Sequence, residues 1–525
     1  MTETQIELVV GLLVVTIPLV ALARRSQIAY PIVLVLGGLA LGFVPGLPAV
    51  QLEPNLVLLL FLPPLLYWEA ITAPTDVMIA NGTQIGMLAI GLVLATTVAV
   101  AAGAHAVIPH LPWAAAFVLG AIVAPTDELA SAPVLERFQI PRHVIAIVEG
   151  ESLLNDALSL VIYAAAVTAL VTGVFSFGRA VLDLVAGAFA SVIIGVIIGR
   201  IAVEGWRRVS DTDLQTVISL ILPFLSYIPA LLLGISGVLE VVTTGVYVNR
   251  FTPVVLTPES RLRLVGFWQT FVFIANALLF LLLGVQLHAI ATGVFARHPW
   301  QMVVASTAAV NLIVIVVRFA WIIGMEFIPN VGGSSEHADP DWKHAMVAAW
   351  SGLRGAVSLA AALAIPTTIA GGLAFPDRDL IIFLTFTVIV VTLVGGGLTL
   401  PILVTRLNIS ESSEEEEREM RRALAGASKA ALDCIQRLEE AKELDPDYAQ
   451  ILRHRYDDLR QRSRQSADSS TRERNRRRAK AEHEIIEAQR QALTAMREGG
   501  EIDNTVLRNV MLALDLAEAR RFHKE

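Results

Sequence analysis

The apolar residues of this chain are gathered in long runs and do not alternate with polar ones. About thirteen of these runs have the roughly 20 residues with which an α-helix crosses the hydrocarbon of a bilayer. Their limits are about 6–23, 28–46, 55–71, 84–108, 113–135, 143–171, 179–203, 213–232, 235–250, 265–290, 300–327, 341–369 and 380–405. We therefore predict an all-α membrane protein with about 13 transmembrane helices. Alternatively, the runs on either side of Gly234 form one bent helix, which lowers the count by one.

The overall composition agrees with a membrane protein and narrows its chemistry. Of 525 residues, 55% are hydrophobic and only 17% are charged, and the mean hydropathy is +0.63, which is unusual for a water-soluble chain of this length. The single cysteine, Cys434, excludes a disulfide framework, a Cys-based zinc site and an iron–sulfur cluster. The spans contain no nucleophile–base pair, His–Glu metal motif or phosphate loop. We therefore expect a protein that is not an enzyme and has no cofactor.

The basic residues of the loops predict the orientation of the chain. Successive loops of a multi-span protein lie on alternate sides of the membrane. The loops and chain end on one side hold twelve Lys and Arg residues, whereas those on the other side hold only Arg179, Arg297 and Arg378. Because short loops rich in Lys and Arg stay in the cytoplasm, we expect the N-terminus outside and the C-terminus inside. The predicted location is the cell (plasma) membrane, with multiple passes.

The composition changes abruptly after about residue 410. Residues 411–525 contain 23 Lys+Arg and 25 Asp+Glu, and apolar residues return there at helical spacing. We predict a charged, helical, cytoplasmic tail that regulates or oligomerises the protein, with an unknown regulator as partner. The Arg-rich stretch at 472–480 is surrounded by acids that cancel its field, so nucleic acid is not predicted as a partner.

Nine ionisable residues lie inside or at the edge of the predicted spans, where a charge is costly and is a functional candidate by default. They are Glu69, Asp127, Glu128, Glu149, Glu151, Asp156, Glu240, Arg318 and Arg354. With a rise of about 1.5 Å per residue, Asp156 lies about 20 Å from the cytoplasmic face, Arg354 about 18 Å and Asp127 about 9 Å. Three separate spans therefore carry charge into the membrane interior.

Two of these spans contain helix breakers beside the charge. Pro125 precedes Asp127, and Gly352 and Gly355 flank Arg354. Proline removes a backbone donor and glycine loosens a helix, so we predict that both spans are interrupted. Interrupted helices at matching places in two halves are typical of a transporter's binding site, because their ends present dipoles and carbonyl groups to an ion.

The sixth span carries oxygen ligands on one face. Ser152 is followed by Asn155 three residues later and by Asp156 four residues later, so a hydroxyl, an amide and a carboxylate share one side of the helix. A hard cation such as Na⁺ prefers oxygen ligands, and Thr126 on the interrupted fifth span offers another. We predict that this group binds the ion and the proton around Asp156. The alternative is that it only joins helices to one another.

Glu151 points about a quarter-turn away from this face and therefore needs a partner. Arg354 is the candidate, because either charge alone is expensive at this depth. We predict a structural ion pair between Glu151 and Arg354. Arg318 is a candidate for charge balance, on carbonyl groups or a nearby acid. Asp127 either belongs to the ion and proton site or is a structural acid balanced by a fixed positive group.

Four segments resemble signature segments of the electroneutral sodium/proton exchangers, a branch of the monovalent cation/proton antiporter family. They are, in family order, FLPPLLYWE (61–69), APTD (124–127), VEGESLLND (148–156) and GLRGAVSL (352–359). The resemblance covers about residues 5–410, and the tail is similar to tails of bacterial members. The sequence departs from the family at Glu128, where the family usually has proline.

The resemblance implies two inverted six-helix repeats with two broken helices. It implies a transmembrane domain at 1–410, with a dimerisation part at about 1–75 and 176–295 and a core transport part at about 76–175 and 296–410. The protein is then a homodimer with the tail at 411–525. The residues that the resemblance places at the Na⁺ and proton site are Asp156, Asn155, Ser152, Thr126 and Glu69. It also matches Glu151 and Arg354 to the family's stabilising pair.

These observations predict a secondary transporter that exchanges Na⁺, or else Li⁺ or K⁺, for H⁺. Burial disfavours the charged form of a carboxylate, so Asp156 is expected to hold either a proton or a cation while an alternating-access core carries it across. Because its neighbour Asn155 is neutral, we expect a 1:1 exchange without net charge movement. The alternatives are a K⁺/H⁺ or electrogenic antiporter of the same superfamily and, from another class, a cation channel.

Overall fold

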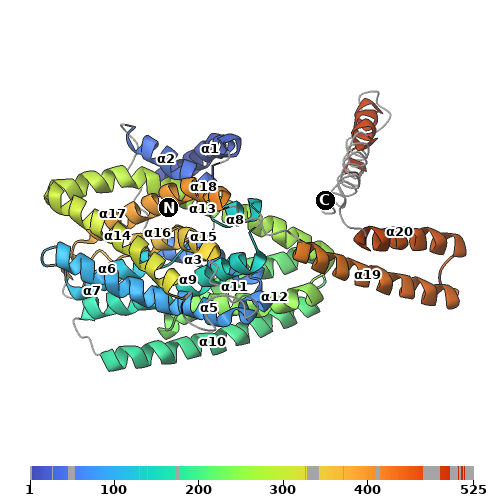
Figure 1. The fold of residues 1–525 in the computed structure, drawn as a ribbon, viewed down its shortest axis with the longest axis horizontal. Coiled ribbons are helices and arrows are strands. Elements are labelled where there is room, and N and C mark those ends of the chain that lie inside the picture. The colour runs from blue at the N-terminus through green and yellow to red at the C-terminus, as the bar shows by residue number, and fades with distance from the viewer. Residues whose placement is uncertain are drawn as a thin grey trace. The chain divides into compact units, whose positions relative to one another are not determined.

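The structure is a computed structural model that describes two compact units, Met1–Glu411 and Ser412–Glu525. The described residues are 3–26, 28–44, 54–128, 131–138, 140–172, 177–325, 327, 342–369, 372–407, 414–464 and 485–496, with Leu507, Val510, Met511 and Leu514. Apart from an isolated bridge between Thr368 and Ala374, these residues form helices, turns and loops (Figure 1). The predicted all-α fold class is confirmed.

The first unit consists of helices that follow the predicted spans. In its first half they are α1 (Glu3–Ser26), α2 (Tyr30–Gly42), α3 (Pro54–Thr72), α4 (Thr75–Ala80), α5 (Gly82–Gly86), the π-helix η1 (Met87–Leu92), α6 (Val93–Val107), α7 (Trp113–Val123), α8 (Ala132–Arg137) and α9 (Arg142–Thr172). In its second half they are α10 (Phe177–Arg208), α11 (Thr212–Leu233), α12 (Gly237–Val255), α13 (Pro258–Arg297), α14 (Trp300–Met325), α15 (Trp342–Trp350), α16 (Ala356–Leu363), α17 (Arg378–Val390), the π-helix η3 (Val391–Gly396) and α18 (Gly397–Leu407).

Each predicted span falls on one helix or on consecutive helices. Among the described residues, seven helices are long and apolar enough to cross a membrane, and three shorter apolar helices accompany them. Gly234 ends α11 in the left-handed region with φ 68°, and the Ser236 hydroxyl caps α12 by accepting from Leu239 N at 3.2 Å. The alternative of one bent helix at this point is therefore wrong.

The tenth span is longer than the hydropathy pattern predicts. α13 has 40 residues, because Thr257 caps its polar first turn and Pro258 occupies the first helical position. Polar residues at the ends of a span lower its hydropathy without ending the helix, so the pattern underestimates the length. The fourth span agrees with the prediction, since α4 ends at Ala80 and the span runs from Gly82 to Val107 through α5, η1 and α6.

The fifth and twelfth spans are interrupted, as predicted. α7 ends at Val123 and is followed by residues 124–128, which are not helical and which we name the first break. α15 ends at Trp350 and α16 begins at Ala356, so residues 351–355 form the second break. In both places the helix stops at the Pro or Gly positions that the sequence shows.

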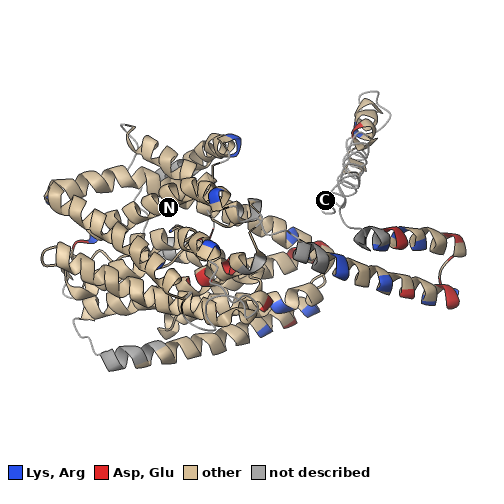
Figure 2. Ribbon diagram, viewed as in Figure 1, with Lys and Arg blue, Asp and Glu red and all other residues tan. Residues whose placement is uncertain are grey.

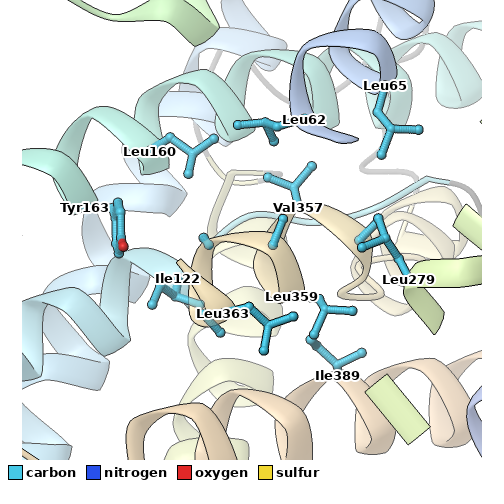
Figure 3. Packing of buried hydrophobic residues seen from close by; sticks show 14 of the residues in the cluster. Leu62, Leu65, Ile122, Leu160, Tyr163, Leu279, Val357, Leu359, Leu363 and Ile389 are labelled. Atoms are coloured by element: carbon cyan, nitrogen blue, oxygen red, sulfur yellow. The ribbon is translucent and has the colours of Figure 1, made fainter. Parts of the chain in front are cut away.

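Short helix α16 lies at the centre of the packing and brings the second break into the core. It contacts α3, α7, α13 and α17. Figure 3 shows Val357, Leu359 and Leu363 of α16 among buried side chains of these neighbours, such as Leu62 and Leu279. The segment that follows the break is therefore held on all sides.

The other helices of the first unit pack around α16 and on each other. α13 lies along α2, and α12 contacts α3, α10 and α11; α6 contacts α7 and α14, and α7 contacts α9. α2 and α13 approach closely where Gly38 faces Gly284, since a Cβ on either would overlap the backbone of the other helix.

The second unit contains the helices α19 (Glu414–Glu440) and α20 (Pro446–Arg464), which pack on each other. Ile435 and Ala449 are buried between them, and Arg453 forms an ion pair with Glu439. Figure 2 shows charged residues along both helices, whereas most of the first unit carries none. The basic run at 472–480 lies outside the described residues.

Candidate functional site

The two breaks contact each other directly. The backbone N–H of Asp127 in the first break donates to the carbonyl oxygen of Leu353 in the second, at 2.7 Å. The carboxylate oxygen Oδ2 of Asp127 accepts from the backbone N–H of Ala356, at 2.8 Å. Ala356 is the first residue of α16, so the carboxylate lies at the positive end of that helix dipole. Asp127 therefore caps a helix that lies 229 positions further along the chain.

Arginine side chains occupy the opposite, negative helix ends. Arg354 donates through Nε to the carbonyl oxygen of Val123, the last residue of α7, at 3.2 Å, and also to the carbonyl of Gly352. Arg318 of α14 donates to the carbonyl oxygens of Ala348 and Ala349, both at 2.9 Å, in the last turn of α15. The C-terminal ends of α7 and α15 and the N-terminal end of α16 are thus each matched by a side chain of opposite charge.

Glycine at 355 is required by this arrangement. A Cβ there would overlap the carboxylate of Asp127 that caps α16. We expect Gly355→Ala to push Asp127 away from Ala356, to cost at least the about 1–3 kcal/mol typical of overpacking, and to reduce transport. Thermal unfolding and transport assays of the purified protein measure both effects. Gly324→Ala is the matched control, because nothing lies within 4 Å of a Cβ at Gly324; equal behaviour of the two variants would contradict this role.

The ion pair of Glu151 differs from the prediction. Glu151, 2% exposed, accepts two hydrogen bonds from Arg318, at 2.5 Å from Nη1 and 3.1 Å from Nη2. The predicted pair of Glu151 with Arg354 is therefore wrong in its partner. Arg354 lies in the second break, where its guanidinium donates to the carbonyl groups of Val123 and Gly352. Arg318 fills the role of charge balance for which it was a candidate.

Thr126 joins the first break to α9 through three hydrogen bonds. Its hydroxyl donates to Glu151 Oε1 at 3.2 Å and accepts from Asn155 Nδ2 at 2.9 Å, and its carbonyl oxygen accepts from Ser152 Oγ at 2.9 Å. The pair of Arg318 and Glu151 fixes which groups donate and which accept in this series of hydrogen bonds, because arginine only donates and a carboxylate only accepts. The Thr126 proton must then go to Glu151, and Asn155 must use its NH₂ group on Thr126. The amide oxygen of Asn155 is left over.

Three buried acceptor oxygens near the first break have no hydrogen-bond donor among the described residues. They are Oδ1 of Asp156, Oδ1 of Asn155 and Oε2 of Glu69. Asp156 itself is 2% exposed. Buried polar atoms of proteins are almost always hydrogen-bonded, so a set of unsatisfied oxygens marks a place that is suited to a cation or to protons.

The carboxylates of this region lie close enough to interact electrostatically. Asp156 interacts with Asp127 and Glu128, and Glu69 interacts with Asp156 and Asp127. All the residues predicted for the ion and proton site thus occur in one region, where α3, α9 and the first break meet. The structure adds to this set the helix cap made by Asp127, which no local sequence pattern near α16 indicates.

A bundle of membrane-spanning helices in which two interrupted helices cross beside buried, unsatisfied acids is the architecture of a secondary ion transporter. A family model described as "Sodium/hydrogen exchanger, transmembrane" matches residues 10–406. The chain belongs to this family of membrane-embedded cation/proton antiporters, which are transporters and not enzymes.

Relatives and solved structures agree with this assignment. An uncharacterised Na⁺/H⁺ exchanger of Mycobacterium tuberculosis (strain ATCC 25618 / H37Rv) is 33% identical over 97% of this chain and 96% of its own length. A sodium, potassium, lithium and rubidium/H⁺ antiporter of Bacillus subtilis (strain 168) is 30% identical over 89% of this chain and 70% of its own. The structure of a sodium proton antiporter from Methanocaldococcus jannaschii at pH 8 shares the fold, with a TM-score of 0.61, 20% identity and coverage of 77% of this chain and 99% of that chain.

Proposed function

We propose that the protein exchanges Na⁺ for H⁺ across the cell membrane, one for one, through competition at Asp156. The observation that carries this proposal is the Oδ1 atom of Asp156, which is buried beside the first break and lacks a donor among the described residues. A carboxylate in such a place needs either its own proton or a bound cation to compensate for lost hydration. The two ligands then exclude each other at a single site.

The proposed Na⁺ ligands are oxygen atoms, which suit a hard monovalent cation. Asp156 and Glu69 offer carboxylate oxygens without donors. Ser152 and Thr126 use their hydroxyl protons on Thr126 O and Glu151, so lone pairs of Ser152 Oγ are available to a cation, and Thr126 Oγ1 keeps one beside the bond that it accepts from Asn155. Li⁺ and K⁺ prefer the same ligand type, and the Bacillus subtilis relative carries a name that includes sodium, potassium, lithium and rubidium. We place Na⁺ first among these substrates because the matched family model is named for it.

Electroneutral exchange is supported by the fixed charges around Asp156. Glu151 is paired with Arg318, and the charge of Asp127 faces the N-terminus of α16. The neighbour of Asp156 is the neutral Asn155, whose NH₂ group is bound by Thr126. Asp156 is then neutral both with a proton and with Na⁺, so a core that carries either form moves no net charge.

Alternating access is proposed to move the core relative to a scaffold that dimerises. The core is residues 76–175 and 296–410, which contain both breaks, and the scaffold is residues 1–75 and 176–295. The extensive contacts of α6 with α7 and α14 and of α12 with α3 and α10 support this division, with α9 in contact with both parts. The N-terminus is placed outside and the tail in the cytoplasm, where an unknown regulator binds it.

Exchange assays in sealed proteoliposomes test the proposal. With an imposed pH gradient, we expect added Na⁺ to release the gradient, as measured by a pH-sensitive dye, without a change in a voltage-sensitive dye. A Na⁺-driven potential would identify an electrogenic antiporter of the same superfamily. A sustained Na⁺ current without counterflow of protons would identify a channel and contradict exchange. Repeating the assay with Li⁺ and K⁺ ranks the substrates.

A further inference from the structure

Glu240 is a second buried carboxylate, and it lies outside the site of Asp156. It belongs to the first turn of α12, in the scaffold helices, and it is 0% exposed. Neither of its two carboxylate oxygens has a hydrogen-bond partner among the described residues. The transport mechanism has no use for this residue, and it is not a member of the four signature segments.

Neighbouring helices cover Glu240 closely. α10 packs against its turn, because a Cβ on Gly195 would meet the carbonyl oxygen of Glu240 at 2.7 Å and the side chain of Thr243 at 2.9 Å. The ring of Tyr227 on α11 packs against Gly237, at the start of the same turn. The turn of α12 that carries Glu240 is therefore packed against α10 and α11, and the residue is not exposed to solvent.

In the part of the chain that the structure describes, no basic side chain pairs with Glu240. The helices that pack against α12 carry titratable and charged residues that include Arg200 of α10, Tyr227 of α11, Tyr67 and Glu69 of α3, and Tyr163 and Asp156 of α9. Arg200 is exposed and follows Gly199, which contacts Tyr247 two turns of α12 away from Glu240. Within the described part of the chain, no charged group interacts electrostatically with Glu240.

Three hydroxyl groups on α11 and α12 are already committed to other acceptors. Thr243 donates to Leu239 O at 2.7 Å, Thr244 to Gly195 O at 3.1 Å, and Ser226 to Thr244 Oγ1 at 3.0 Å. Each hydroxyl has one proton to give, so none of these three can solvate a carboxylate. The N-terminus of α12 offsets only part of the cost of a buried charge, since helix dipoles are weak compared with ion desolvation.

We propose that Glu240 is a proton-binding site of the scaffold, separate from the transport site, and that the bundle of α10, α11 and α12 folds with this acid in its neutral form. A bound proton makes the carboxyl group neutral, so that it needs no counter-charge. Among the described residues, no such counter-charge pairs with Glu240. An acid that is neutral in the fold but ionised in the unfolded chain binds an extra proton on folding, so stability falls as pH rises. Glu240 therefore makes the scaffold less stable as the pH rises from the acidic range to neutral pH.

Infrared spectroscopy of the purified full-length protein tests the protonation state. We expect wild-type protein at neutral pH to show a carbonyl stretching band of a neutral carboxylic acid that is lost in Glu240→Gln. The band should remain when Na⁺ is added and in an Asp156→Asn background, so the result is independent of the proposed transport function. Glu204→Gln is the matched control, because Glu204 is on α10 with a side chain 46% exposed and pairs with Arg208. Identical spectra of wild type and Glu240→Gln would overturn the proposal.

Thermal unfolding as a function of pH gives a second test. We expect the apparent Tm of wild type to fall relative to that of Glu240→Gln as the pH rises from about 4.3, where a glutamate of the unfolded chain ionises, to neutral pH, while Glu204→Gln follows wild type. Glu240→Leu, which is also neutral, should show the same relative gain over this range. A parallel pH dependence of wild type and both variants, or failure of both variants to fold at neutral pH, would show that the ionised form is native.

Discussion

Replacing Asp156 with Asn is expected to reduce cation/proton exchange to the background of protein-free liposomes while the protein still folds. Asn has the same shape but cannot bind and release a proton, and its amide oxygen is a weaker cation ligand than a carboxylate. The Oδ1 atom of Asp156 makes no hydrogen bond among the described residues, so no contact of the fold is lost with it. Removing a costly buried charge should raise the apparent Tm or leave it unchanged.

The control for this prediction is an acid on the same unit that faces outward. Asp76 in the first turn of α4 is exposed, and Asp76→Asn should exchange Na⁺ for H⁺ like wild type. Initial rates of pH-gradient release across a range of Na⁺ concentrations compare the three proteins. Exchange by Asp156→Asn at a rate near that of Asp76→Asn would contradict the assignment of the carrier, and an unfolded Asp156→Asn would show that this carboxylate is structural.

The helices and their interruptions are predictable because they depend on local chemistry. A run of about 20 apolar residues has one stable form in hydrocarbon, since only a helix satisfies all its backbone groups there. Pro125 and the pair Gly352 and Gly355 mark both breaks in the sequence, and the helices stop at these positions. The hydropathy pattern does not predict the direction that the chain takes after each break. That direction depends on contacts between the two breaks.

The partner of Glu151 could not be obtained from depth alone. Arg318 and Arg354 lie on neighbouring spans, and both are deep in the membrane, so each is a candidate for an acid on a third span. The rotation of a helix about its own axis decides between them, and packing against other helices sets that rotation. In the structure Arg354 is drawn to the carbonyl end of α7, which leaves Arg318 for Glu151.

The role of Asp127 shows a similar limit. Asp is a favoured capping residue, but a cap is normally recognised just before the helix that it serves. At the start of α16 that position is Gly355, which has no side chain, and the cap comes from the first break instead. The absence of a Cβ at Gly355 leaves space for the Asp127 carboxylate, but glycine by itself does not indicate which side chain fills that space.

The second large effect is expected from breaking the pair of Glu151 and Arg318. Both side chains are almost fully buried, at 2% and 3% exposure, so removing one partner leaves an uncompensated charge. We expect Glu151→Gln and Arg318→Met each to cost about 3–5 kcal/mol, and exchange to fall with them. Loss of Glu151 also removes the group that accepts the Thr126 hydroxyl proton. The Thr126 hydroxyl in turn accepts from the Asn155 NH₂ group and so fixes the orientation of Asn155 at the ion site.

A double-mutant cycle separates this pair from the one that the sequence alone suggested. Glu151→Gln combined with Arg318→Met should be destabilised by much less than the sum of the single variants, because no unpaired charge remains. Glu151→Gln combined with Arg354→Met should show no such recovery, since Arg354 binds the carbonyl groups of Val123 and Gly352. The exposed pair of Glu204 and Arg208 is the control, with an expected coupling below about 1 kcal/mol. Recovery with Arg354→Met but not with Arg318→Met in thermal unfolding would reverse the assignment, and Thr126 would then be oriented by a different ion pair.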